Sequence, residues 1–573
     1  MKALLLILTV LLNNASAEEP RNAGAGVHFV GSSICAACHR EIYNSFKKTS
    51  MGRSFGEITP DLLAAFPANA TINASSPGHS YRVYSSNGRL YQSESVVLQD
   101  GQRISGATFP VEYVVGSGVS GYTFLFRRDN RLFEAPISYY SSNRTWDLSP
   151  GFDAYDAGFT RPAQVACLEC HIGRFVPGVP NDGSFPKQPF AEVSIGCESC
   201  HGPGELHVTE RGAGKIADPP DNSIVNPATL PQELSNEICL RCHQGNDARV
   251  FQVGKSLADF RPGTRLSDTL FVFKAPLRRD QAVNDSDLLE HGFAMTLSKC
   301  FRSSRTMTCA SCHSVHRNIE PAEKVGFYRS RCLACHANID CGLPVSERKA
   351  NDCASCHMPK RPVAIVAHTA LTNHRIVRTA IEAYPQSAFT DTPAESPGLI
   401  RVSGAAVRNQ EPVPDLVLLQ AYRALVTKAP WLLTPYAALL DRLRSAQPDN
   451  PIVQSASGHE LVTGGSSDAS KEAIPLLQKS LESGVFDSEV CLDLAEALMK
   501  QHRLDAATRV LKHGVAHEPF EPKLRKMLIS VTMEAGSYPE SERAMTDYLR
   551  IYPADTRIRN LLNEMRTADG PNK

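Results

Sequence analysis

The sequence predicts a mainly α protein in two parts, with a small antiparallel β insertion in the first part. Three observations lead to this prediction. A cysteine motif recurs seven times before residue 360, strand-like alternation occupies residues 71–152, and a regular helical period recurs within residues 414–567. At 573 residues, the chain is long enough for two or three domains.

The overall composition excludes several classes of protein. Hydrophobic residues make up 42% and charged residues 21% of the chain, which is typical of a soluble globular protein. The 60 Lys and Arg residues balance the 60 Asp and Glu residues. The chain therefore has no net charge that would attract nucleic acid, and we expect no nucleic-acid partner.

The N-terminus has the three features of a secretory signal peptide. Lys2 precedes an apolar run over residues 3–12, and the small residues Ala15-Ser16-Ala17 follow. The apolar run is shorter than the roughly 20 residues that span a bilayer, and no later stretch is apolar enough. We therefore expect cleavage after about Ala17, an exported or periplasmic mature protein, and no integral membrane segment.

Seven copies of Cys-x-x-Cys-His dominate the first part of the chain, where chance would supply roughly 0.02 copies. The copies are Cys35-Ala-Ala-Cys38-His39, Cys167-Leu-Glu-Cys170-His171, Cys197-Glu-Ser-Cys200-His201, Cys239-Leu-Arg-Cys242-His243, Cys309-Ala-Ser-Cys312-His313, Cys332-Leu-Ala-Cys335-His336 and Cys353-Ala-Ser-Cys356-His357. This motif is typical of covalent attachment of c-type haem. The two thiols reach the two vinyl groups, and the adjacent histidine meets the iron.

Zinc binding and disulfides are the alternatives for these cysteines. Zinc sites and thioredoxin-type pairs do not need a histidine after every second cysteine. The sequence therefore predicts seven covalently bound haem c groups, with the motif cysteines as attachment points and the motif histidines as axial ligands. Six motifs lie within residues 167–356, or about one per 32 residues. We expect the porphyrins to form the core of a cytochrome domain over residues 18–380.

Further histidines are candidates for the second axial ligand of each iron, and methionine is the alternative. The stronger candidates are His207, His291, His316, His368 and His374. A Gly-Pro-Gly turn precedes His207 and can direct it back towards a nearby haem. His28 and Met51 compete for the first haem, whereas His79 follows Ser-Ser-Pro-Gly, which is typical of an exposed loop.

Three cysteines lie outside the motifs. Cys300 and Cys341 flank the fifth and sixth motifs, and an oxidising compartment permits a disulfide between them. The alternative, two unpaired thiols, stays open. Cys491 falls in a helical repeat, where we expect a buried thiol.

The stretch between the first two motifs alternates as strands do. Asn87-Gly88 is a hairpin signal between two short runs. Residues 111–115 and 122–126 are further strand candidates, and Asp129-Asn130 is a turn between strands. We expect a β-rich insertion over residues 71–152.

Beyond a linker over residues 381–413, the pattern becomes helical and repetitive. Three pairs of like residues recur at one common interval: Ala473 with Ala507, Leu477 with Leu511, and Pro519 with Pro553. This interval, with small and apolar residues at the recurring positions, matches the period of about 34 residues that is typical of tetratricopeptide repeats. Such repeats stack into an α-solenoid, and we expect this one to dock partner proteins.

The mature chain resembles exported bacterial multihaem c-type cytochromes with C-terminal tetratricopeptide repeats. The resemblance lies in three stretches: Cys197-x-x-Cys-His-Gly-Pro-Gly-x-x-His207, Cys309-x-x-Cys-His-x-x-His316 and Cys353-x-x-Cys-His-Met-Pro359. The first and last are similar to the cytochrome c-554-like family, which takes electrons from hydroxylamine oxidation. This resemblance implies that His207 is a distal ligand. Where the family carries Trp and then His, this chain has Phe46 and Met51.

Two functions are compatible with these features. The sequence favours electron transfer between redox partner proteins through haems with paired axial ligands. The alternative is a multihaem oxidoreductase that acts on a small nitrogen or sulfur species, which needs an iron with an open coordination position. The Cys-x-x-Cys-Lys motif of pentahaem nitrite reductases does not occur in the sequence.

Overall fold

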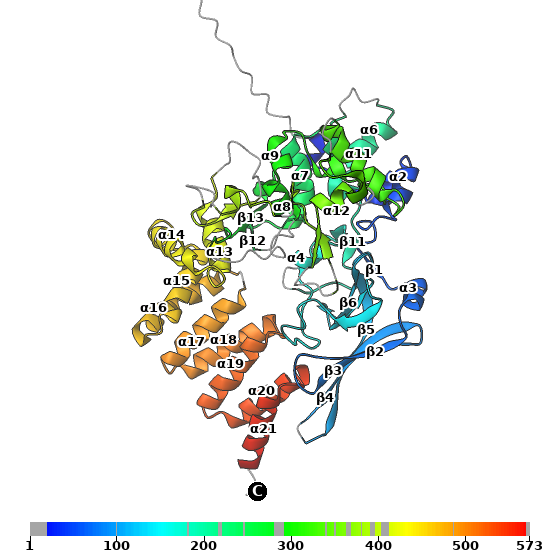
Figure 1. The fold of residues 1–573 in the computed structure, drawn as a ribbon. Helices are drawn as coiled ribbons and strands as arrows, with labels where there is room; N and C mark the ends of the chain where they lie inside the picture. The colour runs from blue at the N-terminus through cyan, green and yellow to red at the C-terminus, as the bar shows by residue number, and fades with distance from the viewer. Residues whose placement is uncertain are drawn as a thin grey trace, which may run out of the picture.

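The computed structural model describes most of the chain. The described residues are 20–98, 100–179, 183–215, 221–244, 247–279, 291–337, 341–348, 351–362, 368, 370–379, 381–389, 396–402, 412–484 and 486–568. The predicted signal peptide lies outside them, as does part of the predicted linker. The described fold combines short helices, a large antiparallel sheet and a C-terminal helical stretch (Figure 1).

The segment between the first two motifs forms a nine-stranded sheet. Its strands are β1 (Phe55–Glu57), β2 (Asn69–Asn73), β3 (His79–Ser86), β4 (Arg89–Val97), β5 (Arg103–Val115), β6 (Gly121–Arg128), β7 (Arg131–Glu134), β8 (Ile137–Tyr140) and β9 (Thr145–Leu148). The order is β2-β3-β4-β5-β6-β8-β9, with β1 beside β5 and β7 beside β6. All neighbours are antiparallel, as the sequence predicted, but the sheet is larger than a small insertion.

The predicted hairpin lies between β3 and β4. Asn87 has φ 48° and Gly88 has φ 72°, so both central residues are left-handed, as a type I′ turn requires. Ser86 pairs with Arg89 directly beyond this turn. Asparagine and glycine tolerate this conformation better than other residues, which is why the dipeptide marks the hairpin.

The sheet has two apolar faces because side chains alternate along β6. Phe124 and Phe126 point into one core, which also contains Phe66 and Trp146. Leu125, between them in sequence, belongs to a second core on the other face. That second core is completed by Leu168, which lies within the second motif, and by Ile172, which directly follows it. The sheet thus fixes the position of the second motif.

The remaining motifs lie on short elements. The helices are α1 (Ser32–Cys35), α2 (Arg40–Phe46), α3 (Pro60–Ala65), α4 (Val165–Leu168), α5 (Glu198–His201), α6 (Glu205–Gly212), α7 (Gln232–Leu240), α8 (His291–Leu297), α9 (Lys299–Ser303), α10 (Cys309–Cys312), α11 (Lys324–His336) and α12 (Cys353–His357). Three small antiparallel sheets join β10 (Arg174–Phe175) to β11 (Phe190–Glu192), β13 (Leu270–Lys274) to both β12 (Ala248–Phe251) and β16 (Ile400–Arg401), and β14 (Lys360–Pro362) to β15 (Ala370–Thr372).

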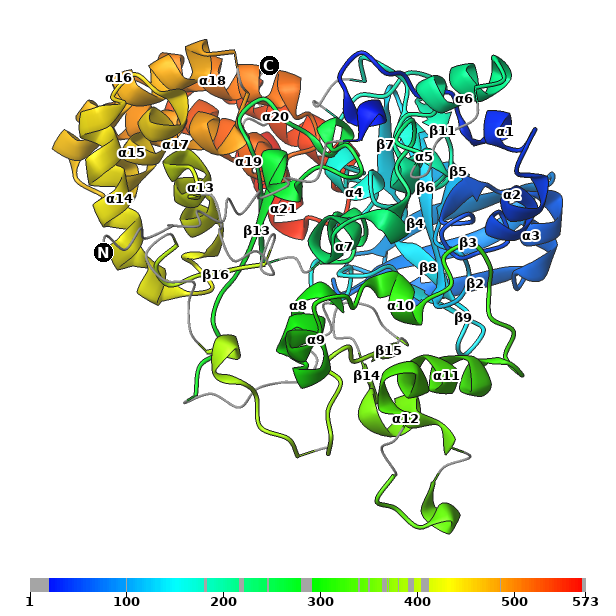
Figure 2. The same ribbon diagram turned by 90° about the horizontal axis from the view of Figure 1, so that it is seen from above.

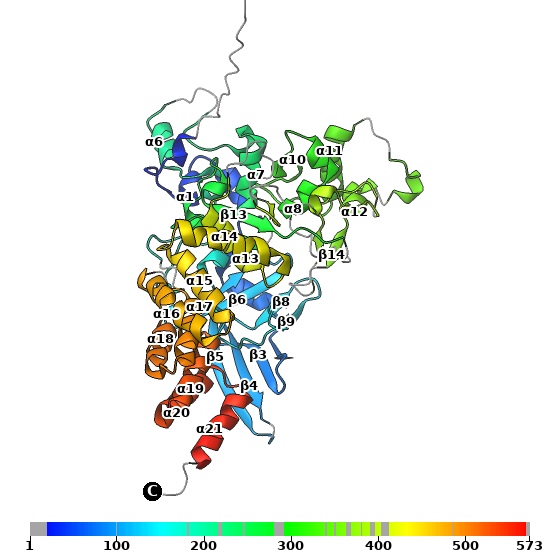
Figure 3. The same cartoon turned by 90° about the vertical axis from the view of Figure 1, so that its left-hand side faces the viewer.

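Side-chain packing differs between the motifs. An apolar core that includes Ile238, Phe260 and Leu266 packs against cysteines of the second, third and fourth motifs. By contrast, no residue of α11 or α12, which are both fully described, is buried. These two helices carry the sixth and seventh motifs and project from the rest of the molecule (Figures 2 and 3). We expected few buried protein side chains around the motifs. This expectation agrees with the structure at the sixth and seventh motifs but not at the second, third and fourth.

The C-terminal helical stretch repeats with the predicted period. Its helices are α13 (Asp415–Leu425), α14 (Leu433–Ala446), α15 (Pro451–Thr463), α16 (Ser467–Glu482), α17 (Ser488–Lys500), α18 (Leu504–His517), α19 (Pro522–Glu534), α20 (Tyr538–Ile551) and α21 (Thr556–Ala568). Helices α17, α19 and α21 start at Ser488, Pro522 and Thr556, which repeat at the interval that separates Ala473 from Ala507. The predicted apolar positions Leu477, Ala507 and Leu511 are fully buried, as is Cys491.

The helical stretch packs against the rest of the molecule at two places. Near its start, Val417 and Tyr422 of α13 share a core with Val250 of β12 and Phe273 of β13. Near its end, the ring of Phe520 lies 4.7 Å from that of Phe133 in β7. Two views show the helices running from the small β12–β13 sheet down to the large sheet (Figures 1 and 3).

His79 is buried in the large sheet, so the predicted exposed loop at this residue is wrong. Its Nδ1 lies 2.7 Å from a carboxylate oxygen of Asp156, and its Nε2 lies 3.0 Å from one of Glu94. Burial alone would lower the pKa of His79, but the hydrogen bonds to Asp156 and Glu94 outweigh burial and raise the pKa to about 9. The protonated imidazole therefore joins β3 to β4 and to the loop that carries Asp156.

We expect this cluster to make stability depend on pH. Because the folded-state pKa of His79 is raised, its contribution is fully present below the unfolded pKa of about 6.5 and is lost as pH rises through about 9. The loss amounts to about 3 kcal/mol of unfolding free energy. Urea unfolding at several pH values should show this slope in the native protein and a smaller slope in His79→Gln. Substitution of the exposed His513 by Gln is the control, and an equal slope in both variants would contradict the assignment.

Candidate haem centres

Local backbone geometry brings the two thiols and the histidine of each motif together. In four motifs, the histidine N–H donates to the carbonyl of the first cysteine, at 2.9 Å for His39 and 3.0 Å for His201. The same bond measures 2.9 Å at His243 and 3.0 Å at His313. This is one helical turn, which places residues three and four apart on one face. Both thiols and the imidazole can therefore reach the same haem.

Four motif histidines each face a second histidine from elsewhere in the chain. The ring centres of His39 and His207 lie 6.5 Å apart with an angle of 22° between the ring planes. The other three pairs are His201 with His316 at 6.0 Å and 11°, His313 with His374 at 6.1 Å and 26°, and His243 with His291 at 5.5 Å and 51°. In every pair, one member belongs to a motif and the other was predicted as a distal ligand.

The separation within these pairs matches the space that an iron would need. A histidine nitrogen lies about 2 Å from the metal it binds and about 1 Å from its own ring centre, so two imidazoles on opposite sides of one iron have ring centres about 6 Å apart. The protonation states agree with this role, because a ligand imidazole must be neutral. Burial lowers the pKa of His291 to about 3 and that of His374 to about 4.

Hydrogen bonds at Nδ1 orient several of these rings. The Nδ1 atom of His201 lies 2.8 Å from the carbonyl oxygen of Val225, and that of His374 lies 3.0 Å from the carbonyl oxygen of Thr372. In the seventh motif, His357 Nδ1 lies 2.7 Å from the carbonyl oxygen of Val377. A bond at Nδ1 fixes the tautomer and leaves Nε2 for a metal. Sequence reasoning missed these carbonyl partners because they are backbone atoms, which carry no side-chain signal.

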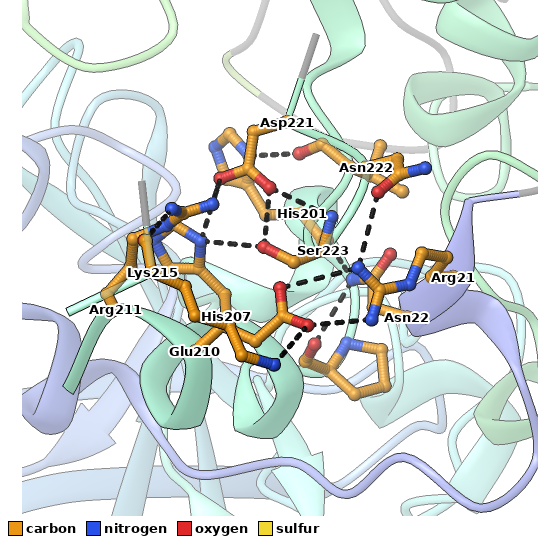
Figure 4. Close-up of polar contacts among 12 residues, drawn as sticks. Arg21, Asn22, His201, His207, Glu210, Arg211, Lys215, Asp221, Asn222 and Ser223 are labelled. Atoms are coloured by element: carbon orange, nitrogen blue, oxygen red, sulfur yellow. Dashed lines mark hydrogen bonds and ion pairs between the residues drawn. The ribbon is translucent and has the colours of Figure 1, made fainter. Parts of the chain in front are cut away.

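His207 is held by a polar network on α6 (Figure 4). Its Nδ1 lies 3.1 Å from the hydroxyl of Ser223 and 3.1 Å from Asp221, and Arg211 also pairs with Asp221 at 2.8 Å. The Gly-Pro-Gly turn before α6 begins at Gly202, where φ is 72°. A Cβ atom at Gly202 would lie 2.8 Å from the amide nitrogen of Asn22, so only glycine fits this turn.

The remaining predicted ligands lie apart from the four pairs. His28 is exposed, and its Nδ1 bonds to Glu205 Oε2 at 2.8 Å, so it binds the start of α6 instead of facing His39. His368 bonds to Asp147 at 2.7 Å and packs against Tyr140. Met51 is half-buried in the turn that follows α2. Sequence reasoning placed His28 or Met51 opposite His39, whereas the structure places His207 there.

Three motif histidines have no second histidine ring beside them within the described part of the chain. They are His171, His336 and His357. Segments 338–340, 349–350 and 363–367, which adjoin the sixth and seventh motifs, lie outside the described residues. Residues 154–179 around His171 are all described. Burial lowers the pKa of His171, which keeps its imidazole neutral.

Cysteines of different motifs contact one another. The Cys197 thiol is the largest influence that raises the pKa of the Cys35 thiol, which places the first and third motifs side by side. Equivalent contacts join the second and fourth motifs through Cys170 and Cys242, the fourth and fifth through Cys239 and Cys309, and the sixth and seventh through Cys332 and Cys353. Cys300 and Cys341 are both free thiols in the structure, so the disulfide considered from the sequence is not formed there.

Three comparisons place the chain among known proteins. The family described as cytochrome c554 and c-prime matches residues 154–202, which include the second and third motifs. A curated relative, the multiheme cytochrome MtrA of Shewanella baltica, is 25% identical over 186 residues, which are 30% of this chain. The chain spans about half of that relative, 52% of its length.

Solved structures show weaker likeness. The outer cell wall cytochrome OcwA covers 86% of this chain and 99% of its own length at 16% identity, with a TM-score of 0.36. A MamA structure covers 26% of this chain and 81% of its own length at 24% identity, with a TM-score of 0.21. No helix among the described residues is long and apolar enough to cross a membrane.

The histidine pairs lead to a spectroscopic prediction. His207→Ala removes the imidazole opposite His39, so one iron loses a ligand and should become high-spin. Electron paramagnetic resonance of the oxidised protein should then show one additional high-spin ferric signal per chain. His28→Ala is the matched control and should leave the spectrum unchanged. An unchanged spectrum in His207→Ala would contradict the pairing.

Proposed function

We propose that this chain is an exported, periplasmic multihaem c-type cytochrome that holds seven covalently bound haem c groups and transfers electrons between redox partner proteins. The observation that carries the proposal is the set of four histidine pairs. In each pair, the distance between ring centres is close to the roughly 6 Å expected for two imidazoles on one iron. The match to the cytochrome c554 and c-prime family and the similarity to a multiheme cytochrome support it.

The chain's own residues would hold the cofactors as follows. The motif cysteines would form thioethers, and the motif histidines would bind the iron, with His207, His316, His291 and His374 as second ligands. Bound haem supplies a one-electron redox centre. Two neutral imidazoles per iron favour the low-spin state and leave no coordination position for a substrate, which suits electron transfer.

The contacts between motifs support an ordered row. The thiol contacts run from the first to the third motif and from the fourth to the fifth. The third and fourth motifs interact electrostatically through Cys200 and Cys239, and the fifth and sixth through Cys312 and Cys335. The second motif branches from the fourth at Cys242. Each motif therefore has at least one neighbouring motif in the fold, which supports electron transfer from one to the next.

Both ends of this row reach the surface. His39 of the first motif is exposed, and the sixth and seventh motifs lie on the projecting helices α11 and α12 (Figure 2). We place exchange with redox partners at these two ends. We also assign partner docking to the tetratricopeptide-like helical stretch. Its removal would expose Val250 and Phe273, which pack on α13, so surface substitutions test docking better than truncation does.

A haem count tests the proposal. The pyridine haemochrome assay on protein produced with haem-attachment machinery should give seven haems per chain. The double variant Cys353→Ala, Cys356→Ala should give six, because thioether formation at the seventh motif is lost. Cys491→Ala, which removes a buried thiol outside the motifs, should still give seven. A count of seven in the Cys353→Ala, Cys356→Ala protein would contradict the attachment sites.

A second candidate function, a multihaem oxidoreductase that acts on a small nitrogen or sulfur species, is favoured by one observation. Among the residues that the structure describes, no second histidine ring packs against His171 as in the four pairs. An iron bound there would have an open position, as catalysis requires.

Ligand binding and turnover separate these two candidates. An open iron at His171 should bind carbon monoxide in the reduced native protein, and the enzyme candidate requires turnover of nitrite or hydroxylamine as well. His207→Ala is the control, because it opens an iron away from His171. We expect binding without turnover in both proteins. Turnover by both proteins would favour the oxidoreductase at the His171 iron, whereas turnover by His207→Ala alone would come from the iron opened by the substitution.

A further inference from the structure

A cavity of about 440 Å³ lies where the large sheet meets the C-terminal helices. Its walls come from the end of β6, at Arg128 and Asp129, and from α18, α19, α20 and the loop that carries Phe520. This volume is in the range of small-molecule sites in proteins. No motif residue lines it, so neither proposed function accounts for it.

Two arginines of the cavity have no carboxylate partner within ion-pair distance among the described residues. Arg128 lies with its guanidinium 4.8 Å from the ring centre of Phe520 and 5.8 Å from that of Phe109. Arg525 donates from Nε to the carbonyl of Pro519 at 2.6 Å, which leaves its terminal nitrogens for another acceptor. The aromatic rings and this hydrogen bond hold both guanidinium groups in place before any ligand arrives.

The two guanidinium groups are close enough for their positive charges to interact. Burial lowers the pKa of Arg128 and of Arg525, and the positive charge of Arg128 adds to the effect at Arg525. The cavity also contains Asp547, which pairs with Arg550 at 3.2 Å and whose charge raises the pKa of Arg525, opposing the effect of Arg128. Asp129 is exposed at the rim. Two half-buried like charges that lie close together are a site where an anion relieves repulsion.

Apart from Asp129 and the Asp547–Arg550 pair, the rest of the lining is largely apolar. Val515, Leu528, Ala544 and Ile551 contribute hydrocarbon surface beside the two arginines. A bare inorganic anion would leave this surface without a contact, whereas an organic acid would cover it. The lining therefore selects a ligand with one anionic end and one apolar end.

We propose that this cavity binds a small organic acid, with its carboxylate held by Arg128 and Arg525 and its apolar body against Leu528 and Ile551. Because the walls come from both the sheet and the helices, a bound acid would also join these two parts. This site is independent of the haem centres, and it assigns to the chain a binding function beyond electron transfer.

Isothermal titration of the haem-loaded full chain with hexanoate tests the proposal, at constant ionic strength maintained with sodium chloride. We expect saturable binding of hexanoate, weaker binding of acetate and no binding of hexylammonium. Arg128→Gln and Arg525→Gln should each weaken hexanoate binding by about tenfold or more, because each removes a charge-assisted hydrogen bond. Arg543→Gln, an exposed arginine of α20 outside the cavity, is the matched control and should bind normally.

A second set of variants separates binding from folding. Arg525→Lys keeps the charge and should restore part of the affinity lost in Arg525→Gln. Leu528→Ser should weaken hexanoate binding while acetate binding stays unchanged. Haem content is measured for every variant, so a failure of haem assembly is recognised separately. Absence of saturable hexanoate binding, or equal affinity of the native chain and the Arg128→Gln, Arg525→Gln double variant, would overturn the proposal.

Discussion

The geometry between paired histidines is the constraint on which the first part of the molecule depends. Under the proposed function, each pair has to hold two imidazoles with their ring centres about 6 Å apart, although its members come from distant segments, such as His39 and His207. The backbone cannot do this locally. The left-handed turn at Gly202, the hydrogen bonds of Asp221 and Ser223 to His207, and the carbonyl at Val225 beside His201 all serve that spacing.

What could be predicted from the sequence follows from how local each feature is. The attachment motif occupies a single helical turn, so its composition alone indicates its chemistry. The period of the C-terminal helices and the Asn87-Gly88 hairpin are also local signals, and both agree with the structure. The pairing of distal ligands is not local, which is why the sequence placed His28 or Met51, and not His207, opposite His39. The prediction of an exposed loop at His79 was wrong for the same reason, because its partner Asp156 lies 77 residues away.

The large sheet connects parts of the molecule that the sequence treats as separate. One face packs against the second motif through Leu168 and Ile172. The other face is an aromatic core around Phe66 that continues to Phe520 of the helical stretch. A change in the sheet therefore reaches both the cofactor region and the helices. Its extent was underestimated because strands as short as β1 and β7 do not show alternation.

The two attachments of the helical stretch have a consequence for its evolution. Arrays of helical repeats ordinarily gain or lose whole units, because each unit touches only its neighbours. Here Val417 is fixed to the small β12–β13 sheet at one end and Phe520 to the large sheet at the other. The span between these two points sets how many units fit. Duplication or deletion of a single unit would break one attachment. The two attachments therefore constrain the number of repeat units in this chain.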